Sequence, residues 1–552
     1  MTTATVARPR PAEFARGGGD FTGTLRLLRL YLRRDRIVLP LWVLLLSAPL
    51  GSVYIDSTEK VYSTPEQVQN FAHSILSNPA MLAMYGPIYN TTSGAAAGLW
   101  KAGMFHTLIG VATILVVIRH TRAEEETGRE ELLASTRLGR FANLTAALIV
   151  ACGGALVTGL IGAASIAGAG EPGVDALAFG LAEAASGIVF AAVAAVAAQL
   201  SASARTARGI AFAVLAACYG LRALGDVRSA GGSTSVLTWL SPQGWSLQVR
   251  PFAGNHFGVL LLHAVTAVVL VAVAYTLLNR RDLGAGMIAE RPGAPAAGPA
   301  LTGPFGLAWR LQRGTLLAWT IGITLYALVF GGVIHDLGDE LGDSKAVADI
   351  IARLGGAQVV EDGFVNMAYT LIGVAASAYA ISAALRLHSE ESTQHAETVL
   401  TGSIGRMRWA ASHLIFAVLG PVVMLLAAGV VGGLVYGVAA DDIGGKLPRV
   451  LGAALVQLPA VWLFAGVAIV LFGLVPRWAP MAWGVFVAAL AVYLLGAVSG
   501  VPQWVLDLAP YSHLPKLPAE AFRATPVVIL IGAGIVLTAV GLIGFRRRDL
   551  RQ

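Results

Sequence analysis

The sequence predicts an all-α polytopic membrane protein of about twelve transmembrane helices, arranged as two homologous six-helix halves. Hydrophobic residues make up 56% of its 552 residues and charged residues only 13%. The apolar residues fall in long blocks of about 20, which is the length of helix that spans a bilayer. A charged segment between two such blocks recurs once along the chain. Together these observations predict a duplicated membrane protein.

The recurring segment is called here the charged island, and its first copy is Arg119–Arg140. A shift of 266 positions gives the second copy, Leu385–Arg406. Six residues recur: Glu124, Glu125, Thr127, Glu131, Gly139 and Arg140 fall on Glu390, Glu391, Thr393, Glu397, Gly405 and Arg406. Because such a density of charge is excluded from hydrocarbon, each island is expected outside the bilayer, tied to the flanking helices.

Residues 1–36 are expected to form an N-terminal tail that ends in an interfacial helix at Phe21–Arg36, whose arginines suit anionic headgroups. Residues 37–278 are expected to form the first six-helix half. Its membrane helices are predicted at Ile37–Ile55, Leu99–Ile118, Asn143–Ala167, Ala176–Leu200, Gly209–Leu224 and Phe257–Leu278. The long loop after the first of these contains a further predicted helix, Pro65–Met84.

Residues 279–314 are Pro/Ala/Gly-rich in part and are expected to link the halves, ending in an interfacial segment at Trp309–Arg313. Residues 315–545 form the predicted second half and residues 546–552 a C-terminal tail. The membrane helices of this half are predicted at Thr315–His335, Asn366–Leu385, Ala410–Val438, Val450–Leu474, Ala479–Ser499 and Pro526–Phe545. Both halves end alike, since the tetrapeptide Arg-Arg-Asp-Leu occurs at 280–283 and again at 547–550.

The distribution of basic residues predicts the orientation in a bacterial plasma membrane. If the islands and both termini are cytoplasmic, most of the 39 Lys and Arg lie on the inner side. The lysines then fall on or near the outer side, at Lys60, Lys101, Lys345, Lys446 and Lys516. The net charge of +7 is therefore a signal of topology, and no nucleic-acid partner is expected.

The sequence offers few residues for catalysis. No G-x-x-x-x-G-K-[ST] loop is present, so the chain itself is not expected to hydrolyse nucleotide. The histidines are scattered and both cysteines lie in apolar blocks, so neither a metal site nor a nucleophile is predicted. The ionisable residues within apolar blocks are Lys101, His106, Glu183, Arg222, His263 and His413. They sit near predicted helix ends, where such side chains either reach the interface or serve transport directly. A transporter is the leading class.

The segment Arg122–Leu133 resembles the E-E-x-G-[TR]-x-E-x-L-L pattern of ABC-2 type exporter permeases, in which the Arg-Arg-Asp-Leu ending is also found. Over its whole length the chain is similar to the duplicated actinobacterial form of the tetronasin and multidrug efflux type, with a type V exporter-like architecture. The resemblance implies a permease without bound cofactor that moves hydrophobic or amphiphilic, drug- or antibiotic-like molecules outward. ATP and Mg²⁺ would bind two copies of a separate ATP-binding subunit per chain.

In that family the segment between helices 2 and 3 is a coupling helix that docks on the ATP-binding subunit. The resemblance implies this role for Glu124, Glu125, Glu130, Glu131, Arg137, Arg140, Glu390, Glu391, Glu397 and Arg406. Alternatively, these charges are solvated groups at the end of a membrane helix. The second island has Gln394 in place of Gly128 and Ser403 in place of Arg137, so weaker coupling is expected there.

A substrate path between the halves would have an apolar, aromatic lining, which favours an amphiphilic substrate. The candidate residues are Trp42, Met104, Phe105, Tyr219, Trp319, Tyr369 and Trp483. For each of these residues taken singly, core packing is the favoured role. Two other functions remain open: a proton-coupled secondary multidrug transporter, whose corresponding loop would be basic and Gly-rich, and a membrane scaffold or sensor partnered with an ATPase.

Overall fold

The computed structural model describes residues 19–77, 79–129, 138–229, 234–282, 284–289, 295–301, 303–342, 357–496 and 503–549. Within these ranges the protein consists of helices and connecting turns, without a β-strand. Eleven helices of the described part are long and apolar enough to cross a membrane. This confirms the predicted all-α polytopic membrane protein. The chain divides into two compact units, Met1–Pro292 and Gly293–Gln552, and the division falls in the predicted linker.

The first unit begins with α1 (Thr24–Arg34), the predicted interfacial helix, which buries Leu27 and Tyr31 and packs against α10 (Ala142–Gly168). After a turn, the first membrane span is made of three joined helices. They are α2 (Val38–Ser47), the π-helical η1 (Leu50–Ile55) and α3 (Asp56–Val61). The predicted helix Ile37–Ile55 is thus present, but it changes its helical type partway.

The segment after the first span forms two helices, α4 (Pro65–Ser77) and α5 (Pro79–Tyr85), where the sequence predicted one, Pro65–Met84. Pro79 starts the second helix because a proline lacks the N–H needed to continue the first. The second span follows as α6 (Gly94–Leu99), η2 (Lys101–Met104) and α7 (Phe105–His120).

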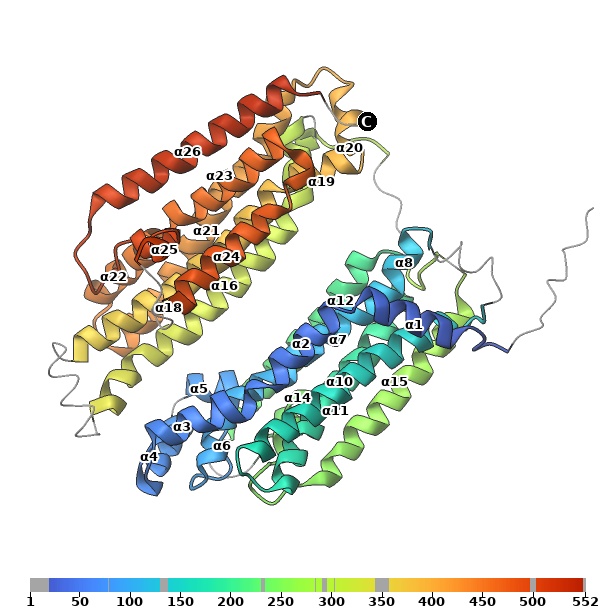
Figure 1. Ribbon diagram of the computed structural model, residues 1–552, viewed down its shortest axis with the longest axis vertical. Coiled ribbons are helices and arrows are strands. Elements are labelled where there is room, and N and C mark those ends of the chain that lie inside the picture. The colour runs from blue at the N-terminus through green and yellow to red at the C-terminus, as the bar shows by residue number, and fades with distance from the viewer. Residues whose placement is uncertain are drawn as a thin grey trace, which may run out of the picture. The chain divides into compact units, whose positions relative to one another are not determined.

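The remaining helices of the first unit pack closely through small residues. They are α8 (Arg122–Glu126), α10, α11 (Gly173–Leu200), α12 (Ala204–Arg228), α13 (Val236–Trp239), α14 (Pro242–Gln248), η3 (Phe257–Val259) and α15 (Leu260–Arg280). A Cβ atom on Gly159 would lie 2.1 Å from the carbonyl oxygen of Gly180, so only glycine allows this approach of α10 and α11. Figure 1 shows α10, α11 and α15 side by side, with α1 and α8 at one end of the unit and α4, α5 and α6 at the other.

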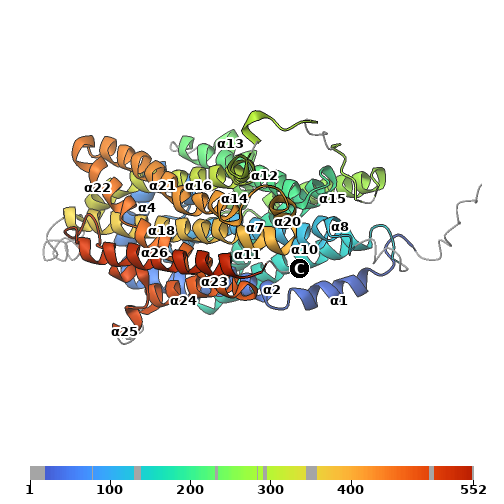
Figure 2. The same cartoon turned by 90° about the horizontal axis from the view of Figure 1, so that it is seen from above.

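The second unit follows a similar plan with different helix lengths. It contains η4 (Pro299–Leu301), α16 (Pro304–Gly342), α18 (Ala357–Ala384), α19 (Arg386–Ser392), α20 (His395–Leu400), α21 (Arg406–Ala439), α22 (Ile443–Leu455), α23 (Leu458–Leu474), η5 (Pro476–Trp478), α24 (Met481–Gly496), α25 (Gln503–Leu506), η6 (Pro510–His513) and α26 (Ala524–Arg547). Helices α23 and α26 lie side by side (Figures 1 and 2) because Gly473 and Gly541 let their backbones touch.

Three predicted elements of the second half differ from the structure. The interfacial segment Trp309–Arg313 and the helix Thr315–His335 are one continuous helix, α16. The predicted helix Val450–Leu474 is interrupted at 456–457, just before Pro459, which removes a backbone donor. The helix predicted at Ala479–Ser499 is described as α24 up to Gly496, and its expected end lies outside the described residues.

Candidate functional site

The first charged island leaves the membrane span through a sharp turn. Helix α7 ends at His120, and the one-turn helix α8 begins directly afterwards. At the end of α8 the backbone of Gly128 is left-handed, with φ of +70°. Glu130, Glu131 and Arg137 lie outside the described residues.

Glu125 forms an internal ion pair with Arg281, the second arginine of the Arg-Arg-Asp-Leu end. Arg281 donates through Nη1 to Glu125 Oε2 at 2.8 Å and through Nη2 to Oε1 at 2.5 Å. Its Nε donates to the side-chain oxygen of Gln199, near the end of α11, at 2.7 Å. The two parallel bonds fix both position and orientation of the guanidinium. The island is therefore tied to the ends of α11 and α15.

Arg122 completes this network from a fully buried position. It donates to the carbonyl oxygens of Ala202, Gly284 and Ala285 at 2.9, 3.0 and 2.9 Å, and it also pairs with Glu125. A buried guanidinium needs its donors satisfied, and here carbonyls of two loops supply the acceptors. Arg122 thus holds the chain after α11 and the chain after α15 against the island.

Three further residues of the first island bind helix ends. Glu124 lies 2.8 Å from the guanidinium of Arg34 at the end of α1. Glu126 accepts a hydrogen bond at 3.0 Å from the backbone N–H of Ala204, the first residue of α12, where a negative charge is favourable. Arg140 donates to the carbonyl oxygens of Leu278, Asn279 and Arg281 at 2.8, 3.0 and 3.1 Å, at the end of α15.

The second island repeats the central contacts with the other Arg-Arg-Asp-Leu end. Arg548 donates to both oxygens of Glu391 at 2.6 Å, and Arg406 donates to the carbonyl oxygen of Arg548 at 2.9 Å. Glu390 pairs with Arg386 at 2.6 Å, within its own helix, rather than with an interfacial helix. The duplication has therefore preserved one arrangement, called here the strut: an island glutamate bonded to the arginine that follows the last helix of its half.

The left-handed turn of the island is also present in both copies. Gln394, at the position of Gly128, has φ of +61°. The second island therefore keeps the backbone path of the first in spite of its side chain, and Glu397 lies in the first turn of α20. The weaker coupling expected from the loss of this glycine stays a prediction, because the shared backbone turn does not test it.

The carboxylates of Glu125 and Glu391 bind arginines of their own chain and are almost fully buried. The side chains of Glu125 and Glu391 are 6% and 7% exposed. The side chains of Arg129 and His395, by contrast, are 60% and 71% exposed. Docking of the islands on another subunit stays a prediction, and its most accessible contacts are these exposed side chains.

The candidate path residues have different surroundings. Trp42 packs against Gly154 of α10, Met104 lies in η2, and Phe105 contacts the ring of Tyr54 edge-on. The others lie as follows: Tyr219 donates to the carbonyl of Met84, Tyr369 is buried and donates to the carbonyl of Ala428, Trp483 contacts Phe486, and Trp319 lines a cavity. Their role in transport stays a prediction.

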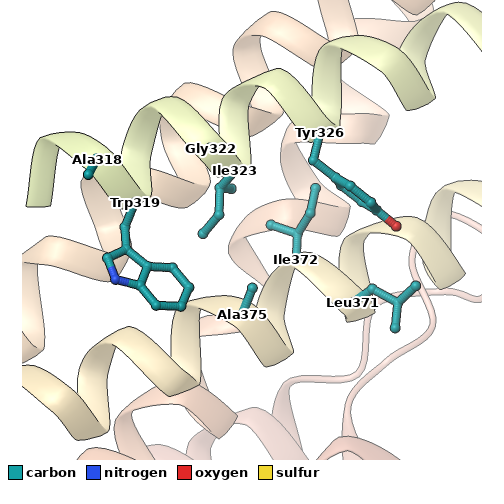
Figure 3. A pocket seen from close by; sticks show the side chains of 8 residues that line it. All are labelled: Ala318, Trp319, Gly322, Ile323, Tyr326, Leu371, Ile372 and Ala375. Atoms are coloured by element: carbon teal, nitrogen blue, oxygen red, sulfur yellow. The ribbon is translucent and has the colours of Figure 1, made fainter. Parts of the chain in front are cut away.

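The cavity lined by Trp319 has a volume of about 470 Å³ and lies between α16 and α18 (Figure 3). Two aromatic side chains of α16, Trp319 and Tyr326, reach toward α18, where Leu371, Ile372 and Ala375 form the facing wall. Apart from the indole N–H and the phenol, the walls are apolar. Such a surface suits a hydrophobic or amphiphilic molecule.

The comparisons with known proteins agree with a transport function. Residues 61–278 and 301–546 match the family described as "Multidrug efflux system permease Rv1217c, C-terminal domain". The chain is also 54% identical, over the full length of both chains, to the multidrug efflux system permease protein Rv1217c of Mycobacterium tuberculosis. The chain belongs to the multidrug efflux permease family. The earlier resemblance to efflux permeases is confirmed at this level.

For this multidrug efflux permease the sequence indicated the island and the repeated Arg-Arg-Asp-Leu end as separate motifs. The structure joins them. Glu125 and Arg281 are 156 residues apart, so no local pattern predicts their contact. A usable signal does exist: both motifs recur with nearly the same shift, since 125 to 391 is 266 positions and 281 to 548 is 267.

Proposed function

We propose that this permease is the membrane subunit of an ATP-driven exporter that moves hydrophobic or amphiphilic, drug- or antibiotic-like molecules out across the bacterial plasma membrane. ATP and Mg²⁺ are bound by a separate ATP-binding subunit, two copies of which serve one chain. The islands and both termini are cytoplasmic, as the arginine distribution favours. The chain itself performs no catalysis.

The observation that carries the proposal is the strut found in each half. Coupling to an ATP-binding subunit requires that a movement of the island is transmitted to the membrane helices and does not merely deform the island itself. Glu125 with Arg281, and Glu391 with Arg548, join each island to the end of the last helix of its half by two charge-assisted bonds. Each half thus presents one charged surface that moves together with its own helices.

The aromatic cavity between α16 and α18 supports the substrate class. Its volume of about 470 Å³ falls within the range of sites for drug-sized molecules. Trp319 and Tyr326 offer flat apolar faces together with one polar group each, which suits an amphiphile better than a sugar or an inorganic ion.

The energy source is tested by co-expressing the chain with an ATP-binding subunit from the same organism, purifying the complex and measuring its mass. We expect two ATP-binding subunits per chain and no hydrolysis by the isolated permease. A one-to-one complex, or ATP hydrolysis by the permease alone, would contradict the proposal.

Docking through the islands is tested with a matched pair of variants. Arg129→Glu changes an exposed side chain and is expected to weaken binding of the ATP-binding subunit while the unfolding temperature stays unchanged. Glu125→Gln changes an internal contact and is expected to lower the unfolding temperature. If Arg129→Glu leaves the binding affinity intact, the exposed part of the first island is not the docking surface.

A further inference from the structure

Glu183 is a buried carboxyl group that the proposed function does not use. It lies well inside α11, with 0% of its surface exposed. Within the described part of the chain neither side-chain oxygen has a hydrogen-bond partner. The sequence placed Glu183 near a helix end, where it would reach the interface or serve transport directly. The structure excludes the first of these roles, because the side chain is fully buried inside α11. A buried polar group without hydrogen-bond partners destabilises the folded state, so its presence needs an explanation.

Three segments of the first half meet at this carboxyl group. A Cβ atom on Gly162 of α10 would lie 3.7 Å from Glu183 Oε2, 2.9 Å from Leu50 and 3.8 Å from the Cβ atom of Ser47. Gly162 therefore makes room where α10, α11 and the junction of α2 with η1 come together. The carboxyl group points into this junction, among apolar atoms.

Among the described residues, no positively charged side chain bonds Glu183. Helices α7, α10, α12, α14 and α15 pack against α11, and η1 packs against α10. The titratable groups inward of the ends of these elements are Tyr54, His106, Cys152, Cys218, Tyr219, Arg222, Asp226, His263 and Tyr275. Arg222 and Asp226 pair with each other at 3.2 Å, and His263 contacts Ser246 and the carbonyl of Pro242. None of these groups hydrogen-bonds Glu183 in the described structure. An ionised carboxylate at this point would cost several kcal/mol, so the group is neutral here.

The helix beside the carboxyl group has an unusual backbone. In η1 the first span widens to a π-helical turn, a feature often found at functional sites. Ser165 of α10 supports this turn by donating to the carbonyl of Ala48 at 2.9 Å and accepting from the N–H of Gly51 at 3.1 Å. A π-helical turn can revert to α-helix by shifting register, which would change the packing around Gly162.

The second half has a neutral side chain at the equivalent sequence position, which lies in the break between α22 and α23. Helices α11 and α23 end at Leu200 and Leu474, and this shift of 274 positions sets Glu183 on Gln457. Gln457 is 1% exposed and its Oε1 atom also lacks a partner within the described residues. A glutamine is close in size and shape to a protonated glutamic acid. The fold therefore accepts the neutral form in both halves, and only the first half can lose a proton there.

We propose that Glu183 is a proton-binding site in the membrane core of the first half. The carboxyl group holds its proton in the conformation described here. When η1 and α10 rearrange so that water enters the junction, the O–H bond breaks and the proton passes to water, leaving a hydrated carboxylate. The return movement takes the proton back. The equilibrium between the two conformations is therefore pH-dependent, and the inference does not depend on the ATP-binding subunit.

The protonated state is tested by infrared spectroscopy of the full chain in lipid nanodiscs at neutral pH. The wild-type spectrum should contain the carbonyl stretch of a protonated carboxylic acid, and Glu183→Gln should lack it. Glu520→Gln, at a side chain that is 48% exposed, serves as the control and should keep the band. Identical spectra for the wild type and Glu183→Gln would overturn the proposal, since the group would then be ionised.

The coupling to conformation is tested with a reporter thiol at Ser47→Cys, in a chain that lacks Cys152 and Cys218. Labelling by a small thiol reagent is compared, at each pH, between the background with Glu183 and the background with Glu183→Gln. The ratio of the labelling rate with Glu183 to the labelling rate with Glu183→Gln cancels the pH dependence of the reagent itself. It should rise with pH, by up to about tenfold per pH unit for one released proton. A ratio that stays constant across pH would show that release of the proton does not open the junction.

Discussion

The two halves enter the membrane differently although they descend from one unit. In the first half α1 stops at Arg34 and a turn at Asp35 redirects the chain into α2, whereas in the second half α16 runs without interruption from Pro304 to Gly342. The residue at the position of Asp35, 277 positions later, is Gln312.

A different set of polar contacts accounts for the break. Asp35 is buried and lies 2.5 Å from Nε2 of His120 and 2.9 Å from Nη1 of Arg119. Gln312, in the part of the chain that the structure describes, instead bonds Nδ1 of His413 at 3.2 Å and stays within its helix. The carboxylate of Asp35 binds two side chains at the end of α7 and thereby fixes the turn between α1 and α2. The amide of Gln312 has no such pair of contacts in the described structure, and α16 continues through it. The difference teaches that the duplicated frame tolerates different charges as long as the strut is kept.

The largest difference between the halves is expected when the struts are cut. Arg281→Ala removes the bidentate partner of the buried Glu125 carboxylate, which keeps its pair with Arg122, and it also removes the donor to Gln199. Breaking such a buried network typically destabilises by about 3–5 kcal/mol. Arg548→Ala removes a more exposed arginine and should cost less, about 1–3 kcal/mol. The unfolding temperature of each variant in lipid nanodiscs measures this. Arg280→Ala, at the exposed neighbouring residue, is the control; equal losses at 281 and 548 would contradict the unequal burial.

A smaller effect is expected from giving the first half the glutamine of the second. Asp35→Gln removes the charge that faces Arg119 and His120, and at neutral pH it should destabilise by about 1–3 kcal/mol. Gln312→Ala is the counterpart and should cost about 1 kcal/mol or less, because the lost bond is neutral. Denaturation followed by helical content measures both variants.

The pH dependence of that effect has a defined sign. Burial raises the pKa of Asp35, but the hydrogen bond from His120 and the charges of His120, Arg119 and Arg34 outweigh it and hold the pKa below its ordinary value of 3.8. The folded state thus binds the proton less tightly than the unfolded chain. The stabilisation by Asp35 is complete above 3.8 and is lost as the pH falls through the folded pKa. The gap between the wild type and Asp35→Gln should therefore close as the pH falls below 3.8.

The smallest expected effect concerns the left-handed turn of the islands. Gln394→Gly should stabilise the second half by about 1 kcal/mol, because φ of +61° strains any residue with a Cβ atom. Gly128→Gln should destabilise the first half by about the same amount, since no atom lies within 4 Å of the position of the new Cβ and only the backbone strain counts. Changes of the same sign in both variants would disprove the shared turn. Gly153→Ala, in the open helical surface of α10, should be neutral or slightly stabilising.

The sequence was sufficient to predict most membrane helices because the signal is local. A run of about twenty mostly apolar residues, as in Phe257–Leu278, predicts a membrane span without any knowledge of the neighbours, and α15 confirms it. The sequence did not predict the structure where contacts between residues far apart in the chain determine it. Whether the chain turns at Asp35 or continues through Gln312 depends on side chains of other helices, which no window along the sequence contains. For the same reason the sequence pointed to Glu125 and to Arg281 but not to the bond between them.

The strut also has a consequence for the order in which the protein is made. Arg281 follows the last helix of the first half, so the bond to Glu125 forms only once all of that half has left the ribosome. It needs no residue of the second half, and Arg548 closes the second half in the same way at the end of the chain. Each half therefore carries its own closing signal at its last residues, and the first can complete its assembly while the second is still being synthesised.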